Sequence, residues 1–277
     1  MKRVESPRLI IFTDLDGTLL DLTSYSFRPA IEALTRVKET ATPLIFCSSK
    51  TAAEQLYYHK EMGIRAPFIV ENGSAIFIPQ DYFTIAYPAQ RTTFAYRVIE
   101  MGVSAAVINQ RLQSMRDDLK LQFQMYTELS INALCRLTGL DRQAASRARL
   151  RDYSETIVGL SRPEAETLHQ ALAPAGLSCT WGGRFCTVTA AQIDKGQAVN
   201  RLTDLFQKQY GAVITVGIGD SANDASFLAA VDEAFLVQQP DQRWEPISTG
   251  YCKPVEGVGP IGWNRVVSNL LNIYYYF

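Results

Sequence analysis

Three short runs of consecutive apolar residues, each followed at once by polar residues, most constrain what this chain can fold into. They are Leu9–Phe12, Leu44–Cys47 and Val213–Ile218. Apolarity without alternation is typical of strands that are buried on both faces of a parallel sheet. Segments with helical spacing follow the runs, at Pro29–Lys38, Ala52–Met62 and Ala225–Val231. This repetition of strand, polar loop and helix predicts an α/β fold with a doubly wound, Rossmann-like parallel sheet.

Between residues 87 and 191 the pattern changes. Apolar residues recur there at helical spacing or alternate along short strands, in the segments Ser104–Lys120, Leu140–Leu150, Thr156–Leu160, Glu164–Ala173 and Phe185–Thr189. This mixture predicts an α+β domain inserted into the α/β core. The core domain then consists of residues 1–86 and 192–277, with hinges near Ala86–Pro88 and Gln192–Asp194.

Charge and composition argue against several classes of protein. The net charge is −1, so there is no global basic field to hold nucleic acid. No apolar run approaches the roughly 20 residues that a membrane-spanning helix needs. Five cysteines without a CxxC pair favour reduced thiols and a cytoplasmic protein. Only two histidines occur, which makes a Ser–His–Asp hydrolase or a zinc site a poor explanation and leaves hydrolytic chemistry to carboxylates and a metal ion.

Two aspartates follow the first apolar run directly. Asp14 and Asp16 are separated by one residue, so in extended chain both side chains face the same pocket. Paired carboxylates repel each other unless a cation lies between them, and Mg²⁺ prefers such hard oxygen ligands. One carboxylate can attack phosphorus, while the other protonates the leaving oxygen and later activates water. The pair therefore predicts a Mg²⁺-dependent phosphoryl-transfer site, against the simpler interpretation of an Asp-rich turn.

Polar residues near the other predicted elements suit the same chemistry. Ser48 follows the second apolar run, where its hydroxyl can bind phosphoryl oxygens or cap a helix. Lys195 begins an amphipathic helix, a position that the helix dipole disfavours for a cation and that indicates an anionic partner. Asp220 follows the third run and is a candidate third ligand for Mg²⁺. Further candidates for contacts with the substrate, Lys195 or the loop are Ser221, Asn223 and Asp224.

Together these motifs resemble the haloacid dehalogenase superfamily of phosphatases. The resemblance rests on Asp14–Thr18, Ser48, Asp194–Gly196 and Gly219–Asp224. It implies that Asp14 is the nucleophile, that Asp16 is the general acid and base, and that Ser48 and Lys195 hold the phosphoryl group. It also implies that Mg²⁺ is bound by Asp14, by Asp16 through its carbonyl oxygen, and by Asp220. The inserted domain would be a cap that closes over the substrate.

A narrower resemblance extends over most of the chain. The segments similar to mannosyl-3-phosphoglycerate phosphatases are Cys47–Gln55, Pro67–Gly73, Leu137–Leu140, Arg151–Thr156, Gly182–Phe185 and Gly259–Trp263. That family hydrolyses mannosyl-3-phosphoglycerate to mannosylglycerate, a compatible solute. The resemblance implies a small phosphorylated sugar-glycerate as substrate. We expect the protein to be a monomer or a homodimer.

Such a substrate carries a phosphate, a carboxylate and several sugar hydroxyls. Arg184 is the candidate for the carboxylate, because a guanidinium binds a carboxylate through two hydrogen bonds. Lys50, which lies close to Ser48 in the sequence, is the candidate for a second anionic group. The candidates for contacts with sugar hydroxyls are Glu71, Asn72 and Gly73.

Several alternatives stay open. At Cys186 and Thr187 the family usually carries an aromatic residue and a histidine, so the hexose can be glucosyl rather than mannosyl. A phosphatase for another sugar phosphate, a phosphomutase, and a non-catalytic sensor of a phosphorylated metabolite are the remaining alternatives. The arginines of one basic run are interpreted as a solvated face of the cap; they are Arg142, Arg147, Arg149 and Arg151.

Overall fold

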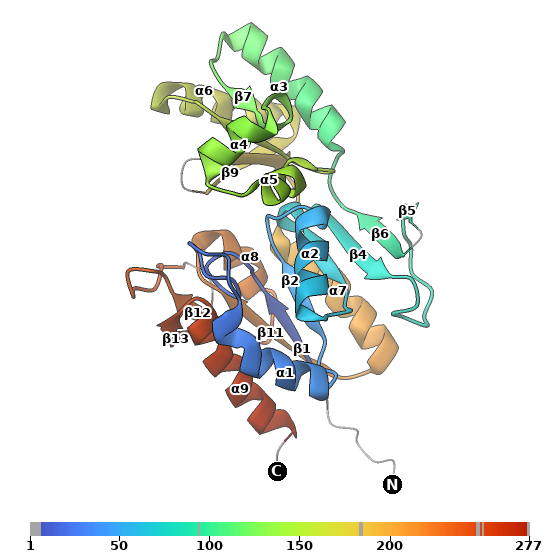
Figure 1. Cartoon of the computed structure of the whole chain (residues 1–277). Coiled ribbons are helices and arrows are strands. Elements are labelled where there is room, and N and C mark those ends of the chain that lie inside the picture. The colour runs from blue at the N-terminus through green and yellow to red at the C-terminus, as the bar shows by residue number, and fades with distance from the viewer. Residues whose placement is uncertain (1–6, 94, 183–184, 248–249, 251, 276–277) are drawn as a thin grey trace.

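A wide, mostly parallel sheet runs through the core of the protein (Figure 1). The computed structural model describes residues 7–93, 95–182, 185–247, 250 and 252–275. Within these residues the sheet has the strand order β13-β12-β11-β1-β2-β3-β4-β6-β5. Its strands are β1 (Arg8–Thr13), β2 (Leu44–Cys47), β3 (Phe68–Val70), β4 (Ala75–Pro79), β5 (Arg91–Thr92), β6 (Tyr96–Glu100), β11 (Val213–Gly219), β12 (Glu233–Gln238) and β13 (Cys252–Val258). Pairing is parallel from β13 to β3 and antiparallel from β3 to β5.

Helices cover both faces of this sheet. On one face lie α1 (Ile31–Glu39), α2 (Ala52–Met62) and α9 (Pro260–Tyr275), and on the other α7 (Lys195–Tyr210) and α8 (Ala225–Leu228). Successive residues of β1 alternate between the two layers, because Leu9 packs in the first apolar cluster and Ile10 in the second. A strand that is buried on both sides has to be apolar throughout. The predicted doubly wound α/β core is therefore confirmed.

The inserted domain is a smaller antiparallel sheet with its own helices, which lies above the core in Figure 1. Its described strands have the order β7-β8-β10-β9. They are β7 (Gln124–Met125), β8 (Glu155–Val158), β9 (Leu177–Gly182) and β10 (Phe185–Ala190). The helices are α3 (Ala105–Leu119), α4 (Ile131–Thr138), α5 (Arg142–Arg149) and α6 (Arg162–Leu172). Because α3 and α6 contribute Ile108, Leu112 and Leu168 to a separate apolar cluster, the insertion has a core of its own.

The first boundary of the insertion differs from the prediction. We placed it at residue 87, but β5 and β6 hydrogen-bond to each other and β6 pairs with β4 of the large sheet. The chain passes into the insertion between Glu100, the end of β6, and Ala105, the start of α3. Residues 96–100 fell inside the predicted insertion, because a short strand does not tell from its own sequence which sheet it joins.

One pair of cysteines lies close together on neighbouring strands of the cap. Cys179 on β9 and Cys186 on β10 have their Cα atoms 5.9 Å apart, a separation within reach of a disulfide. The register of the two antiparallel strands brings these cysteines together, and sequence spacing does not reveal that register. Cys47, Cys135 and Cys252 are free thiols. Among the described helices, none is long and apolar enough to cross a membrane.

Candidate active site

The ends of three neighbouring parallel strands bring the predicted catalytic residues together. Asp14 follows β1, Ser48 follows β2 and Asp220 follows β11, and β1 lies between the other two strands. Parallel strands deliver their carboxyl ends to one edge of the sheet, where ligands bind in folds of this kind. Gly17 allows a close approach at this edge, because a Cβ atom there would lie 2.6 Å from an Asp220 oxygen. Its φ of 81° also favours glycine.

Lys195 is the cation at the centre of this edge. Its side chain is almost completely buried, and Nζ lies 2.7 Å from Asp14 Oδ1 and 2.7 Å from Asp224 Oδ1. Burial alone would lower the pKa of Lys195, but the two adjacent carboxylates raise it above its ordinary value. The ammonium group is therefore permanently charged. The prediction that Lys195 has an anionic partner at the start of its helix is consistent with this geometry.

Two carboxyl groups beside Lys195 have raised pKa values. Burial, opposed by Lys195 and reinforced by Asp224, raises the pKa of Asp14 to about 7. Burial, together with the charges of Asp14 and Asp224, raises the pKa of Asp220 to about 8, although Thr18 Oγ1 donates a hydrogen bond of 3.1 Å to its Oδ1. One ammonium group thus faces three buried carboxyl groups, and the site lacks positive charge.

The acidic cluster fits a divalent cation. Asp14, Asp220 and Asp224 each offer a carboxylate oxygen, and these oxygens lie within 4.8 Å of one another. Asp224, however, already accepts hydrogen bonds from Lys195 and from the backbone N–H groups of Asp220 and Ser221. Asp14 and Asp220 are therefore the carboxylates that remain for a hard cation such as Mg²⁺. Asp224 is fully buried and makes two of the contacts predicted for it, to Lys195 and to the loop, while its contact with substrate stays a prediction.

Asp16 points to a second lysine. Its Oδ2 lies 2.9 Å from Lys50 Nζ, and its buried Oδ1 has no hydrogen-bond partner among the described residues. Lys50 is itself buried and also lies 3.5 Å from Glu54 Oε1. We predicted that Lys50 binds a second anionic group of the substrate. It instead neutralises Asp16 and Glu54 of the protein.

Ser48 lies below the surface of the site. It is buried, its Oγ accepts a 3.3 Å hydrogen bond from the backbone N–H of Lys50, and its carbonyl oxygen accepts one from Asn72. The neighbouring residue Ser49 lines the active-site cavity. Contact of the Ser48 hydroxyl with a phosphoryl group stays a prediction.

Glu71 fastens the cap to the core. Its carboxylate is inaccessible to solvent and accepts hydrogen bonds from Asp152 N (2.9 Å), Tyr153 N (3.1 Å) and Ser154 Oγ. These three donors belong to the segment between α5 and β8 of the cap. Glu71 is fully buried and is not among the residues that line the cavity, so its geometry is that of a residue that joins the two domains, and its contact with sugar hydroxyls stays a prediction.

The two residues after Glu71 have different functions. Asn72 lines the cavity, and its buried Oδ1 has no partner among the described residues. Its φ of 59° is uncommon for a residue with a side chain and indicates a conformation that the surroundings impose. Gly73 permits close packing, because a Cβ atom there would lie 2.1 Å from the carbonyl oxygen of Asp194. Asn72 thus remains a substrate-binding candidate, while Gly73 places the start of α7.

The active-site cavity has a volume of about 510 Å³, and residues of both the core and the cap line it. The core contributes carboxylates and polar groups, namely Asp14, Asp16, Asn72, Asp220, Ser221 and Asn223. The cap contributes an arginine, hydroxyl groups and aromatic rings, namely Arg151, Thr156, Thr187, Tyr126, Trp181 and Phe185. One wall therefore carries reactive groups, and the other resembles a surface for a polyhydroxylated ligand.

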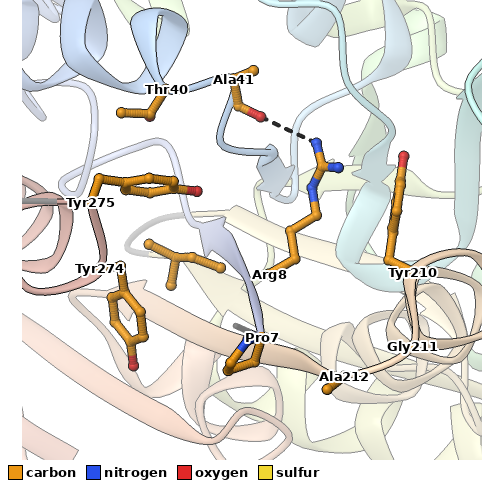
Figure 2. A pocket seen from close by; sticks show the side chains of 10 residues that line it. Pro7, Arg8, Thr40, Ala41, Tyr210, Gly211, Ala212, Tyr274 and Tyr275 are labelled. Carbon is orange, nitrogen blue, oxygen red and sulfur yellow. Dashed lines mark hydrogen bonds between the residues drawn. The ribbon is translucent and has the colours of Figure 1, made fainter. Parts of the chain in front are cut away.

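A larger cavity of about 770 Å³ lies at the opposite end of the sheet (Figure 2). Arg8 at the start of β1 lines it, next to Tyr210, Tyr274 and Tyr275. Its described lining residues include no carboxylate and no predicted catalytic residue. By volume alone this cavity would be the candidate active site. The smaller cavity is the better candidate, because carboxyl groups with raised pKa values line it.

For several residues of the cap, the sequence did not predict correctly whether the side chain reaches the active-site cavity. Arg184 lies outside the described residues. Cys186 is buried in the apolar cluster of the cap, whereas Thr187 lines the cavity, so only the second departure from the family pattern reaches the site. The cavity also exposes Trp181, with 48% of its surface accessible, which we did not predict.

The basic run on the cap is not a uniform solvated face. Arg142 is exposed, but the Arg147 guanidinium lies 4.1 Å from the ring centre of Tyr57 on the core. Arg149 donates a hydrogen bond to the carbonyl oxygen of Thr127. Arg151 lines the active-site cavity, and sequence reasoning missed it although it begins the quoted segment Arg151–Thr156.

This fold and site define a haloacid dehalogenase-like hydrolase, and a sequence profile of haloacid dehalogenase-like hydrolases matches residues 11–103. A solved haloacid dehalogenase-like hydrolase from Bacteroides thetaiotaomicron has the same fold, with a TM-score of 0.68 and 15% identity, covering 96% of this chain and all of its own. Sucrose-phosphatase from Synechocystis is similar too, with a TM-score of 0.60 and 13% identity over 95% of this chain and 98% of its own.

Two curated relatives are much closer in sequence. A glucosyl-3-phosphoglycerate/mannosyl-3-phosphoglycerate phosphatase from Methanococcoides burtonii is 42% identical over 265 residues, covering 95% of this chain and 97% of the relative. A mannosyl-3-phosphoglycerate phosphatase from Pyrococcus horikoshii is 37% identical over 228 residues, covering 82% of this chain and 90% of the relative. The chain belongs to this family of phosphatases that act on sugar phosphates.

Proposed function

We propose that this chain hydrolyses mannosyl-3-phosphoglycerate to mannosylglycerate and phosphate in a Mg²⁺-dependent reaction. The observation that carries the proposal is the contact between Lys195 Nζ and Asp14 Oδ1 at a cavity lined by Asp16 and Asp220. Mere binding of a phosphorylated metabolite needs neither a nucleophile nor an acid, so a non-catalytic sensor explains this arrangement poorly. The names of the relatives support a glycosyl-3-phosphoglycerate as the substrate.

Asp14 is the proposed nucleophile. One of its oxygens attacks phosphorus, and the P–O bond of the aspartyl-phosphate forms as the bond from phosphorus to O3 of the glycerate breaks. Asp16 gives a proton to the leaving oxygen through Oδ1, the atom that has no hydrogen-bond partner among the described residues. Lys195 and the Ser48–Ser49 segment hold the phosphoryl oxygens. Mg²⁺, bound by Asp14, Asp220 and the carbonyl oxygen of Asp16, would supply charge stabilisation when present.

Water then completes the reaction. Asp16, now a carboxylate, accepts a proton from water, whose oxygen attacks phosphorus and releases Asp14 and inorganic phosphate. The cap excludes bulk water from the cavity during both steps. A phosphomutase would instead return the phosphoryl group to a second hydroxyl of the sugar, so release of inorganic phosphate separates the two reactions.

Glucosyl-3-phosphoglycerate is the second candidate substrate, because the relative from Methanococcoides burtonii is named as a phosphatase of both the glucosyl and the mannosyl compound. The deciding experiment measures phosphate release with Mg²⁺ from the mannosyl compound, the glucosyl compound and common sugar phosphates at equal concentration. We expect kcat/KM for the mannosyl compound to exceed that for sugar phosphates by at least about 100-fold, which is roughly 3 kcal/mol of transition-state stabilisation. Preferential turnover of another phosphate, with neither glycosyl compound hydrolysed, would overturn the substrate assignment.

A further inference from the structure

The charges around the active-site cavity are strongly unequal. Four acidic side chains line it, those of Asp14, Asp16, Asp220 and Glu245. Among the described lining residues, Arg151 is the only one with a positive side chain. An anionic substrate that enters this cavity is repelled by the carboxylates, unless cations face each of its own negative groups. Among the described cap residues that line the cavity, Arg151 is therefore the one whose positive charge can bind an anion.

Arg151 is held at the junction of cap and core. It lies between α5 and β8, and its Nη1 donates hydrogen bonds to Ser154 Oγ (2.8 Å) and to the carbonyl oxygen of Ser49 (3.4 Å). Its Nε is buried and has no acceptor among the described residues. The guanidinium is thus oriented by the protein while one of its donors stays unused.

The two acids near Arg151 sense its charge, which opposes the rise that burial causes in the pKa of Glu71 and of Glu155, but they are held by other hydrogen bonds. Glu71 accepts hydrogen bonds from Asp152, Tyr153 and Ser154, as described above. Glu155 is hydrogen-bonded to Thr127 Oγ1 at 2.6 Å and to the backbone N–H of Thr156 at 2.8 Å. Neither acid forms an ion pair with Arg151 in the described part of the chain. The Glu71 contacts fix the backbone at Asp152 and Tyr153, directly after Arg151, and so they help to fix the position of Arg151.

We propose that Arg151 binds the carboxylate of the glycerate part of the substrate while Asp14 faces the phosphate. This inference rests on the proposed function. It gives Arg151 the role of distinguishing phosphorylated substrates that carry a carboxylate from those that do not. Ser49, which Arg151 contacts, follows β2, and Asp14 follows β1, the adjacent strand. Asp14, Ser49 and Arg151 all line the active-site cavity, so a carboxylate held by Arg151 shares one space with a phosphate that faces Asp14. A guanidinium suits this carboxylate because it offers two parallel N–H donors.

Two small ligands test the proposal directly. 3-Phosphoglycerate and glycerol 3-phosphate differ at one end, where the first has a carboxylate and the second a hydroxymethyl group. Each is measured as a competitive inhibitor of p-nitrophenyl phosphate hydrolysis with saturating Mg²⁺, for the wild type, Arg151→Met, Arg151→Lys and Arg142→Met. Arg142→Met is the matched control, because it removes one exposed positive charge from the same segment of the cap.

We expect the wild type and Arg142→Met to bind 3-phosphoglycerate at least about 10-fold more tightly than glycerol 3-phosphate, which is a typical effect of one charged hydrogen-bonded pair. Arg151→Met should lose this preference and bind glycerol 3-phosphate as before. Arg151→Lys should recover part of the preference, because it restores the charge without the paired donors. Equal weakening of both ligands would place Arg151 at the phosphoryl group or in the scaffold, and unchanged preference would exclude any contact; either result overturns the inference.

Failure of the inference can be told apart from failure of the proposed function. The ligand comparison uses an aryl phosphate as reporter, so it does not need a glycosyl-3-phosphoglycerate to be hydrolysed. If the wild type hydrolyses the glycosyl compounds and Arg151→Met keeps the carboxylate preference, only the inference is wrong. If the wild type hydrolyses neither compound and does not prefer 3-phosphoglycerate, the proposed function and the inference are both wrong. Thermal unfolding of the variants, with Arg151→Lys as the conservative change, separates misfolding from loss of binding.

Discussion

Lys195 Nζ lies 2.7 Å from Asp14 Oδ1, although 181 residues separate these two positions in the sequence. The inserted cap occupies about half of that interval, so the chain leaves the active site, builds a domain and returns. The contact joins the proposed nucleophile to the only ammonium group that touches it among the described residues. Removal of either partner should therefore have different and separable consequences.

Asp14→Asn should abolish phosphatase turnover, with a loss of at least about 1,000-fold, because an amide oxygen is a poor nucleophile. The fold should persist, since the substitution removes one of three crowded buried carboxyl groups. Steady-state phosphate release and circular dichroism measure the two effects. Asp81→Asn, an exposed position, is the control. Residual turnover of several per cent would exclude the covalent mechanism.

Lys195→Met should destabilise the protein by about 3–5 kcal/mol, because it leaves the Asp14 and Asp224 carboxylates buried without a counter-charge. Asp224→Asn in the same chain should restore part of this loss, with a coupling of about 0.5–3 kcal/mol. Urea unfolding of both single variants and the double variant gives the coupling. The control is Lys253→Met, whose partly exposed pair with Glu233 should contribute less than about 1 kcal/mol. Strict additivity of the two site substitutions would contradict this interpretation of the cluster.

Mg²⁺ binding should release protons near neutral pH. Without metal, the pKa of Asp14 is raised to about 7 and that of Asp220 to about 8, so both carboxyl groups are partly protonated there. Because the cation binds the deprotonated forms, its affinity should rise as the pH increases from 6 to 8. Calorimetry in two buffers with different ionisation enthalpies measures the proton release. Asp220→Asn should weaken binding strongly, and binding without any proton release would show that these carboxyl groups are not the ligands.

His59 should make stability depend on pH. Its ring is buried between Phe46 and Phe68, and burial lowers its pKa to about 4. The unfolded chain, with a histidine pKa of about 6.5, binds the proton more readily. The resulting contribution, about 3 kcal/mol at most, is fully present above pH 6.5 and is lost as the pH falls towards 4. In His59→Phe the free energy of unfolding should change less between pH 6.5 and pH 4 than in the wild type, whether or not the substitution alters stability at neutral pH. An unchanged slope would exclude His59 as the cause.

Glu71→Gln should loosen the attachment of the cap. The amide group would place N–H donors against the backbone N–H groups of Asp152 or Tyr153, at a cost of about 1–3 kcal/mol. We expect a lower urea midpoint and faster proteolysis of the cap linkers, compared with Glu166→Gln on the exposed side of α6. Equal behaviour of the two variants would show that the Glu71 contacts do not hold the cap in place.

The sequence predicted best those features that depend on local chemistry. The helix Ala52–Met62 was placed correctly, because Thr51 and Glu54 form a capping box at its start and Gly63 has a left-handed conformation after its end. The strand ends at Cys47 and near Thr13 followed from apolar runs that stop abruptly. These signals lie within a few residues of the feature that they specify.

Features that depend on distant residues were predicted poorly. Nothing near Glu71 in the sequence indicates that residues 152–154 occupy its carboxylate, and nothing near Lys50 distinguishes a substrate anion from the Asp16 side chain. Arg151 could not be told from the other arginines of the basic run, because its contact with Ser49 crosses from cap to core. The direction in which a polar side chain points is decided by packing between domains, which leaves no periodic signal in the sequence.

The position of β1 between β2 and β11 has a consequence for how the protein is made. During synthesis β1 and its aspartates emerge early, but β11 follows only about 200 residues later, so β1 must wait with one edge unpaired. The cap strands all lie between Gln124 and Ala190, and the cap can close upon itself before the core is complete. Lys195, Asp220 and the last partner of β1 arrive almost together. A chain that stops before Lys195 therefore carries the nucleophile without its cation, and we expect hydrolytic activity only after Asp220 has been synthesised.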